Sequence, residues 1–202
     1  MTHILQFKNI SPYIQSPEFM AAYKNYDFFI LPTLYHSPNG IHGIGHVRRT
    51  LLLSLIMAYF DKLSARHTKI LAYASVYHDI GRTHDGVDDY HGYASYQKVL
   101  EHGLLNNHEA NEVYAIKELI ERHAISDKKA FSFETLDEDK RDEVQFLLRY
   151  FKDADGLDRV RLGDLNAKYL RTDTAKRMTL VAQQILWHSK GNSNDNCLLD
   201  MI

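Results

Sequence analysis

Two histidines four positions apart, His42 and His46, form the first group of residues that could do chemistry. In a helix this spacing places the two imidazoles one turn apart on the same face. A metalloprotease helix uses the same spacing but needs a glutamate directly after the first histidine, and Gly43 stands there instead. On a helical wheel His46 falls in line with Leu53 and Met57, so we expect it to face the core, either as a hydrogen-bonded core histidine or as a metal ligand.

The adjacent pair His78-Asp79 closes a second predicted helix. Neighbouring residues of a helix diverge by about 100°, so a regular helix would aim the pair poorly at one atom. At a helix end, however, the pair can straddle a metal ion, or two ions can share the carboxylate. An aspartate beside an apolar helix is costly to bury unless it is paired or bound to metal. The alternative is an exposed pair at a helix end.

Two further histidines stand at predicted helix ends. His91 begins a helix twelve residues after Asp79, and His123 ends another, on the face defined by Ile116 and Ile120. His123 could reach a central ion, or it could satisfy the last carbonyl groups of its helix.

Three aspartates lie close together near position 155. Asp155 and Asp158 share a helix face at a spacing of three, whereas Asp153 points elsewhere. Arg159 and Arg161 could neutralise part of this acidity or bind an anionic substrate. At least one of the three aspartates is expected to make only cap or salt-bridge contacts.

Helices must position these residues, because the sequence shows no sustained alternation of apolar and polar residues. The four prolines all lie before position 40, which leaves the rest of the chain free of this helix breaker. Helices are predicted at about 17–30, 43–63, 66–79, 92–102, 109–123, 139–154 and 173–189. Loops are predicted at 82–90, 126–137 and 190–196, and the mostly apolar segment 197–202 is expected to dock on the body or meet a partner. The expected fold is all-α, a single-domain bundle of about seven helices spanning 1–202.

Taken together, these residues predict a metal site inside the bundle. His46, His78, Asp79, His123 and Asp155 fall at or beside core-facing positions on four predicted helices. Inward-pointing histidines and carboxylates on facing helices are a common way to build a metal site in a helical bundle.

Composition excludes several other classes of function. The 202 residues include 24 Lys+Arg and 26 Asp+Glu, a net charge of −2, so the basic surface of a duplex nucleic-acid binder is absent. The single cysteine, Cys197, cannot form an internal disulfide, which fits a reducing compartment. The first residues lack a signal-peptide pattern, and the richest apolar stretch, 51–60, is about half the length of a membrane helix. We expect a cytoplasmic protein that binds neither membrane nor duplex nucleic acid.

The order of these residues resembles the HD-domain superfamily of metal-dependent phosphohydrolases. Its signature is a histidine on one helix, a His-Asp pair closing a later helix, and an aspartate on a final helix. Here these are His46, followed by Arg49, then His78-Asp79, and Asp155. The resemblance runs from about His42 to Arg161, and implies a metal-binding core of about 42–161 with helical extensions at both ends.

The resemblance implies a ligand set. One metal ion would be held by His46, His78, Asp79 and Asp155, with His78 and Asp79 also catalytic. In members with two metals the paired aspartate bridges them, which here implies Asp79 with His91 and His123 on the second ion. Histidine and carboxylate together suit Fe, Mn, Co, Ni or Zn, and paired ions about 3.5–4 Å apart would activate a water molecule.

Around these ligands we predict substrate-binding and supporting residues. Arg49, Arg82, His84 and Arg159 are candidates for contacting a phosphorylated substrate, and His42 for orienting a metal ligand through its own hydrogen bond. Tyrosines could stack on a nucleobase or form core and cleft wall; they stand at positions 73, 77, 90, 93 and 96.

The expected function is hydrolysis of a nucleotide or another small phosphate ester or anhydride by a metal-activated water. A di-iron oxygenase is an alternative, because some relatives of this fold use the same ligands to activate oxygen. A non-catalytic module that senses a nucleotide is another, although a degenerate site would be expected to have lost at least one of the ligands.

Overall fold

The computed structural model describes residues 7–134 and 136–189. These residues form ten α-helices, three short 3₁₀ helices and no strand, which confirms the all-α prediction. The α-helices are α1 (Phe7–Ile14), α2 (Pro17–Asp27), α3 (Ile44–Phe60), α4 (Ala65–Tyr77), α5 (His91–Glu101), α6 (Ala110–His123), α7 (Asp127–Ala130), α8 (Glu138–Leu157), α9 (Asp173–Arg177) and α10 (Thr179–Ser189). The 3₁₀ helices are η1 (Pro32–Leu34), η2 (Asp158–Leu162) and η3 (Ala167–Tyr169). The predicted loop 190–196, the segment 197–202 and Cys197 lie outside the described residues.

The prediction of about seven helices was too low. α1 was missed because it contains Pro12, which supplies no backbone N–H to a helix. α7 is a single turn inside the predicted loop 126–137. The predicted helix 173–189 divides at Met178, whose N–H bonds to the Ala175 carbonyl in a tight turn that ends α9 before α10 begins. α8 in turn extends three residues beyond the predicted end at 154, so Asp155 lies inside it.

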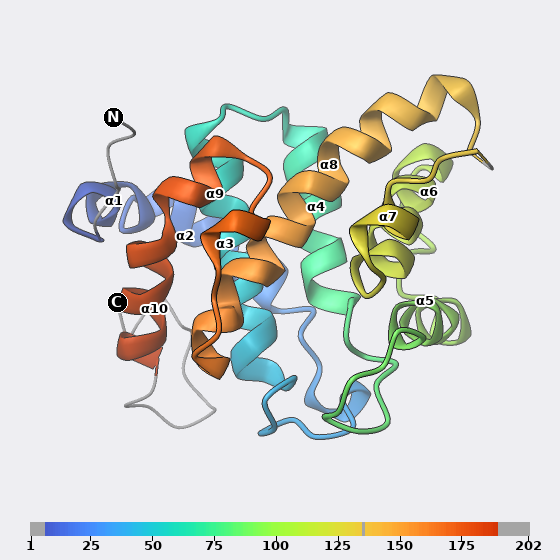
Figure 1. Ribbon diagram of the computed structural model, residues 1–202, viewed down its shortest axis with the longest axis horizontal. Helices are drawn as coiled ribbons and strands as arrows, with labels where there is room; N and C mark the ends of the chain where they lie inside the picture. Colours follow the sequence, from blue (N-terminus) through green and yellow to red (C-terminus); the bar gives the residue numbers. More distant parts are fainter. Residues whose placement is uncertain (1–6, 135, 190–202) are drawn as a thin grey trace.

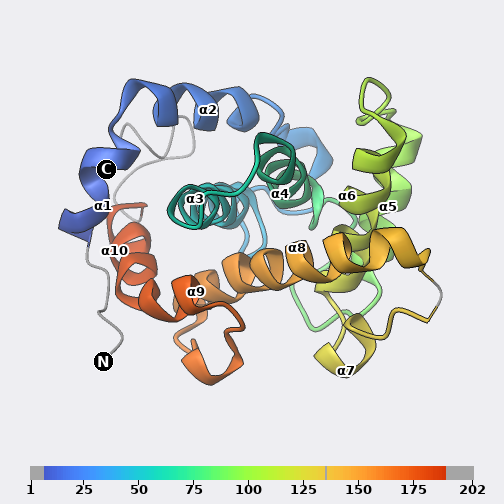
Figure 2. The same cartoon turned by 90° about the horizontal axis from the view of Figure 1, so that it is seen from above.

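The centre of the molecule is the helix α3, which is buried on nearly every side. Residues 50–58 along it have almost no exposed surface, as expected for a helix that is apolar around its whole circumference. α3 and α4 lie side by side, with α2 across one side of the pair and α8 across the other (Figure 2). α5 and α6 cover one end of this arrangement, and α1 and α10 the other.

The residues with candidate chemistry gather at one end of the α3–α4 pair. α3 begins where α4 ends, because the two helices run antiparallel, and the loops preceding α3 and following α4 lie together (Figure 1). α5 packs closely on the end of α6: a Cβ at Gly92 would lie 2.5 Å from the Ile120 carbonyl oxygen, so only glycine allows this approach. The contact brings the first residue of α5, His91, to the last residue of α6, His123.

None of the helices among the described residues combines the length and apolar character that crossing a lipid bilayer requires.

Asp153 fixes the end of α8 to the segment that leads into α9. Its fully buried carboxylate accepts hydrogen bonds from the backbone N–H groups of Arg171 and Thr172, at 2.8 and 2.6 Å. The Thr172 hydroxyl and the Arg171 guanidinium add bonds of 2.8 and 3.0 Å. Asp153 is therefore the aspartate of the three with a purely structural set of partners.

We expect Asp153→Ala to lower the free energy of unfolding by about 3–5 kcal/mol, because the backbone N–H groups of Arg171 and Thr172 and the Thr172 hydroxyl all lose their acceptor. Urea unfolding followed by circular dichroism measures the change. Asp142→Ala, on the exposed side of the same helix, should change stability by less than about 0.5 kcal/mol. Equal effects of the two substitutions would contradict this role for Asp153.

Candidate metal centre

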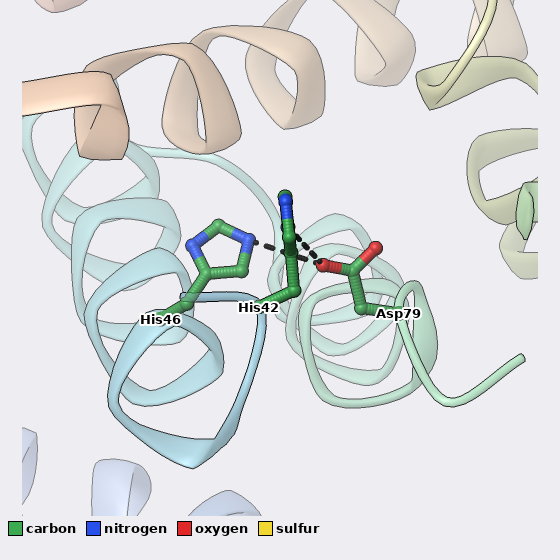
Figure 3. A group of neighbouring side chains, drawn as sticks. All are labelled: His42, His46 and Asp79. Carbon is green, nitrogen blue, oxygen red and sulfur yellow. Dashed lines mark hydrogen bonds and ion pairs between the residues drawn. The ribbon is translucent and has the colours of Figure 1, made fainter. Parts of the chain in front are cut away.

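Asp79 lies at the middle of a buried cluster, and its two carboxylate oxygens face different groups of residues. The Oδ2 atom lies 3.5 Å from His46 Nε2, 3.6 Å from His78 Nε2 and 3.2 Å from His42 Nδ1. Figure 3 shows the rings of His42 and His46 converging on this oxygen. Asp155 completes the group, with its Oδ1 atom 3.4 Å from His46 Nε2.

The Oδ1 atom of Asp79 faces the second group. It lies 3.1 Å from His91 Nε2 and 3.7 Å from His123 Nε2. The Arg82 guanidinium donates to it from Nε at 2.9 Å, and Arg82 Nη2 lies 3.3 Å from His91 Nε2. In the structure Arg82 is thus the cation that balances this side of the carboxylate.

Five helices bring these residues together, and helix ends explain most of the geometry. His46 stands in the first turn of α3, His91 begins α5 and His123 ends α6. α4 ends at Tyr77, and the chain turns after it, with the Arg82 N–H bonding to the Asp79 carbonyl. Because Asp79 has left the helix, it can face the same centre as its neighbour His78, which a continuous helix would prevent.

Four buried histidines present the same ring edge to the centre. Each bonds through Nδ1 to an oxygen outside the cluster, which makes Nδ1 the donor and leaves the Nε2 lone pair facing inward. The acceptors are Asp158 Oδ2 for His46, the Ser75 carbonyl for His78, the Asp88 carbonyl for His91 and the Ile120 carbonyl for His123.

The chemistry of this donor set fits a cation. His46 Nε2 lies 3.1 Å from His78 Nε2, and His91 Nε2 lies 2.8 Å from His123 Nε2. Two lone pairs at such distances repel unless a proton or a metal ion lies between them. Among the described residues, three overlapping sets of ligand atoms are close enough to share an ion: His42, His46 and Asp79; His46, His78 and Asp155; and His78, Asp79 and His123. These buried groups could therefore hold a metal ion.

The protonation states suit metal binding. Burial lowers the pKa of His78 to about 3, so its imidazole is neutral at pH 7. Burial also opposes ionisation of Asp79, but His78, His123, His42 and His91 more than offset it and hold the pKa of this carboxyl well below its usual value. The same balance, with His46 as the main partner, lowers the pKa of Asp155. His46 differs: despite burial and the nearby Arg161, hydrogen bonds to Asp155 and Asp158 raise its pKa.

Asp158 is a positioning residue that sequence reasoning did not assign to the site. Its Oδ2 atom accepts from His46 Nδ1 at 2.8 Å, and Arg49 forks onto its two oxygens at 2.6 and 3.1 Å. Arg49 was predicted to bind substrate. In the structure it is buried and forms an ion pair with Asp158, on the side of His46 that carries Nδ1. The signal was available in the spacing, since Arg49 follows His46 by three residues and Asp158 follows Asp155 by three.

A cavity of about 340 Å³ opens over the cluster, and we call it the loop cavity because the loop 82–90 forms much of its wall. Three of the predicted substrate-binding and supporting residues line it, namely His42, Arg82 and Arg159. His84 does not line it; this exposed residue accepts a hydrogen bond from the Gly86 N–H. A larger cavity of about 550 Å³ lies against α2 and the far end of α3 and contains none of the cluster residues.

The tyrosines proposed for stacking lie elsewhere. Tyr73, Tyr77 and Tyr96 are buried in the core. Tyr90 and Tyr93 are exposed and lie together at the start of α5, with ring centroids 5.0 Å apart, but neither lines the loop cavity.

Comparison of the chain with protein-family models, with curated proteins and with solved structures found no match.

Metal content should separate the two sides of Asp79. Wild-type protein loaded with Mn²⁺ and desalted is expected to hold two ions per chain, measured by inductively coupled plasma mass spectrometry. Asp79→Ala should lose both, because its carboxylate faces both groups, whereas His91→Ala should lose one. His84→Ala, a histidine in the neighbouring loop, is the matched control and should keep both. Full occupancy in Asp79→Ala would contradict the assignment.

Asp158→Asn should weaken metal binding without removing a ligand. The amide keeps the size of the side chain but loses the charge that orients His46 and pairs with Arg49, and such supporting residues typically change metal affinity about 10–100-fold. Competition with a chromogenic chelator measures the affinity. Asp164→Asn, a half-exposed carboxylate in the following segment, should leave it within about twofold. An unchanged affinity in Asp158→Asn would rule out the positioning role.

Proposed function

We propose that the protein is a metal-dependent phosphohydrolase of the HD type, acting on a nucleotide or another small phosphate ester or anhydride. The observation that carries this proposal is the buried Asp79 carboxylate, whose two oxygens face two separate groups of histidines beneath a cavity lined by arginines. A ligand that bridges two ions needs one oxygen directed at each ion, and the two oxygens of Asp79 are arranged in this way.

The chain order of the ligands supports the HD assignment. His46 in α3, His78-Asp79 at the end of α4 and Asp155 in α8 are the residues that the resemblance selects, and their side chains lie within 3.6 Å of at least one other member. His91 and His123, which the resemblance assigns to a second ion, contact the other oxygen of Asp79.

Bound ions would lower the pKa of a water molecule, so that it could attack phosphorus as a nucleophile at neutral pH. They would also neutralise charge on the phosphoryl oxygens. The protein's own residues prepare the site for this. Asp79 stays ionised at neutral pH and His78 stays neutral, so neither must change its proton to bind metal. We expect both to be essential to catalysis.

Access and charge favour a small anionic substrate. The side chains of His46, His78 and Asp79 are at most 1% exposed, whereas that of Asp155 is 30% exposed. A substrate would therefore approach the centre past Asp155. Arg82 and Arg159 line the cavity above it, and their guanidinium groups can donate to phosphate oxygens.

An assay of phosphate release tests this proposal and its alternatives. Protein loaded with Mn²⁺, Co²⁺, Ni²⁺, Fe²⁺ or Zn²⁺ is incubated with a panel of nucleotides and phosphomonoesters, in air and under nitrogen. We expect release at equal rates with and without oxygen, and a loss of at least about 10³-fold in Asp79→Ala, because removal of metal ligands removes the nucleophile. Turnover that requires oxygen would instead identify an oxygenase, and nucleotide binding without turnover a sensing module.

A further inference from the structure

A second cavity, of about 420 Å³, opens onto the same metal centre. It lies between α8 and the segment 164–171 that leads toward α9, and we call it the α8–α9 cavity. His123, Asp155 and Arg159 line both this cavity and the loop cavity. Two cavities that meet at two candidate ligands can be spanned by one molecule with a reacting group at the centre.

The α8–α9 cavity has an apolar wall and an aromatic rim. Leu170 is 5% exposed and packs against Gly156 in α8, where an added Cβ would lie 3.6 Å from the leucine side chain. Tyr169 lines the same cavity and is 74% exposed. Its backbone is fixed in η3, which Asn166 caps by accepting from the Lys168 N–H at 3.0 Å. The structure thus holds an exposed phenol ring beside a small apolar surface.

Charge distinguishes the two cavities. Apart from the candidate ligands, the loop cavity is lined by three aspartates, namely Asp85, Asp88 and Asp89, with Arg82 and Arg159. The α8–α9 cavity is lined by three cations, namely Lys152, Arg159 and Arg171, and by Asp164. Because the phosphate carries the charge of such an ester, the ester is attracted toward the α8–α9 side and away from the side lined by three aspartates.

Among the three cations, Arg159 is the most easily recruited by a ligand. Lys152 donates to the His123 and Ile125 carbonyls at 3.1 and 2.6 Å, and Arg171 pairs with Asp127 and Asp153. Among the described residues the Arg159 guanidinium pairs with Asp164, and both side chains are about half exposed. An exposed pair of this kind contributes little to stability, so Arg159 can turn to a phosphate at the junction of the cavities.

We propose that the α8–α9 cavity receives the alcohol part of the phosphate ester and that Tyr169 stacks there on a planar aromatic ring, as in a nucleoside monophosphate. This inference rests on the proposed function for the position of the phosphate. Tyr169 is then a specificity-determining residue, and Arg159 binds the phosphate where the cavities meet. Stacking suits this position because every nucleobase offers a flat face to an aromatic side chain.

The test compares phosphates that differ only in the ring. Adenosine 5′-monophosphate, cytidine 5′-monophosphate and ribose 5-phosphate are titrated into metal-loaded protein by isothermal calorimetry, and phosphate release is measured in parallel. Tyr169→Ala should weaken binding of both nucleotides about tenfold, the typical loss of one stacking contact, and change ribose 5-phosphate less than twofold. Tyr169→Phe should retain wild-type affinity. Trp187→Ala removes an aromatic ring that is 79% exposed on α10 and serves as the matched control.

The outcomes separate the two proposals. Ring-dependent binding that is lost in Tyr169→Ala supports the subsite even where no phosphate is released, and in that case the phosphohydrolase proposal alone fails. Phosphate release with equal effects of Tyr169→Ala on all three compounds overturns the subsite and leaves the hydrolase in place. Wild-type protein that binds the nucleotides no more tightly than ribose 5-phosphate also overturns the subsite.

Discussion

The burial of the ionised Asp79 carboxylate is the constraint that the rest of the structure serves. A carboxylate whose side chain is 1% exposed is strongly destabilising unless donors or cations reach both oxygens. Arg82 reaches Oδ1, while Oδ2 faces the rings of His42, His46 and His78 among the described residues. Those rings cannot all donate, because the buried histidines have committed Nδ1 to acceptors elsewhere. Without a metal ion, the balance depends on shared protons, and the raised pKa of His46 is one expression of this. The cluster therefore concentrates unfavourable electrostatic contacts at a place where a bound cation could relieve them.

The helices around the cluster are arranged so that their ends meet, and this is why the strain can be tolerated. Helix ends leave backbone carbonyls without intrahelical partners, and at the end of α6 these groups accept from the Lys152 ammonium, at His123 and Ile125. The same lysine lies three residues before Asp155 on α8, so one contact joins two elements that carry candidate ligands. A second contact, from Asp153 to the backbone of Arg171 and Thr172, secures the other side of α8. The candidate ligands are thus positioned by hydrogen bonds at helix ends, while the apolar core lies farther along α3 and α4.

The long helices could be predicted from the sequence because their apolar residues recur with the helical period, and the same period indicated two of the candidate ligands. His46 and His123 continue apolar stripes, and that was sufficient to place them on inward faces. Contacts made by segments without periodicity could not be predicted: the turn that splits α9 from α10 depends on one hydrogen bond at Met178, and the α8–α9 cavity depends on the path of residues 163–171. Asp158 shares a helix face with Asp155 in the sequence pattern, but that spacing does not identify its partner, a histidine 112 positions away.

The two arginines that follow a cluster residue by three positions show why spacing alone does not decide function. Arg49 follows His46 and Arg82 follows Asp79, so the sequence treats them alike. α3 continues past Arg49, and a residue on a continuing helix stays among its packed neighbours, where Asp158 takes up the guanidinium. α4 has already ended before Arg82, and the chain turns so that this side chain lies in the wall of the loop cavity, in contact with Asp79. Arg159 likewise follows the end of a long helix: α8 ends at Leu157, and Arg159 in η2 lines both cavities. Arg49, on a continuing helix, thus supports Asp158, whereas Arg82 and Arg159, beyond helix ends, lie in cavity walls, in keeping with the general placement of binding groups on connecting segments.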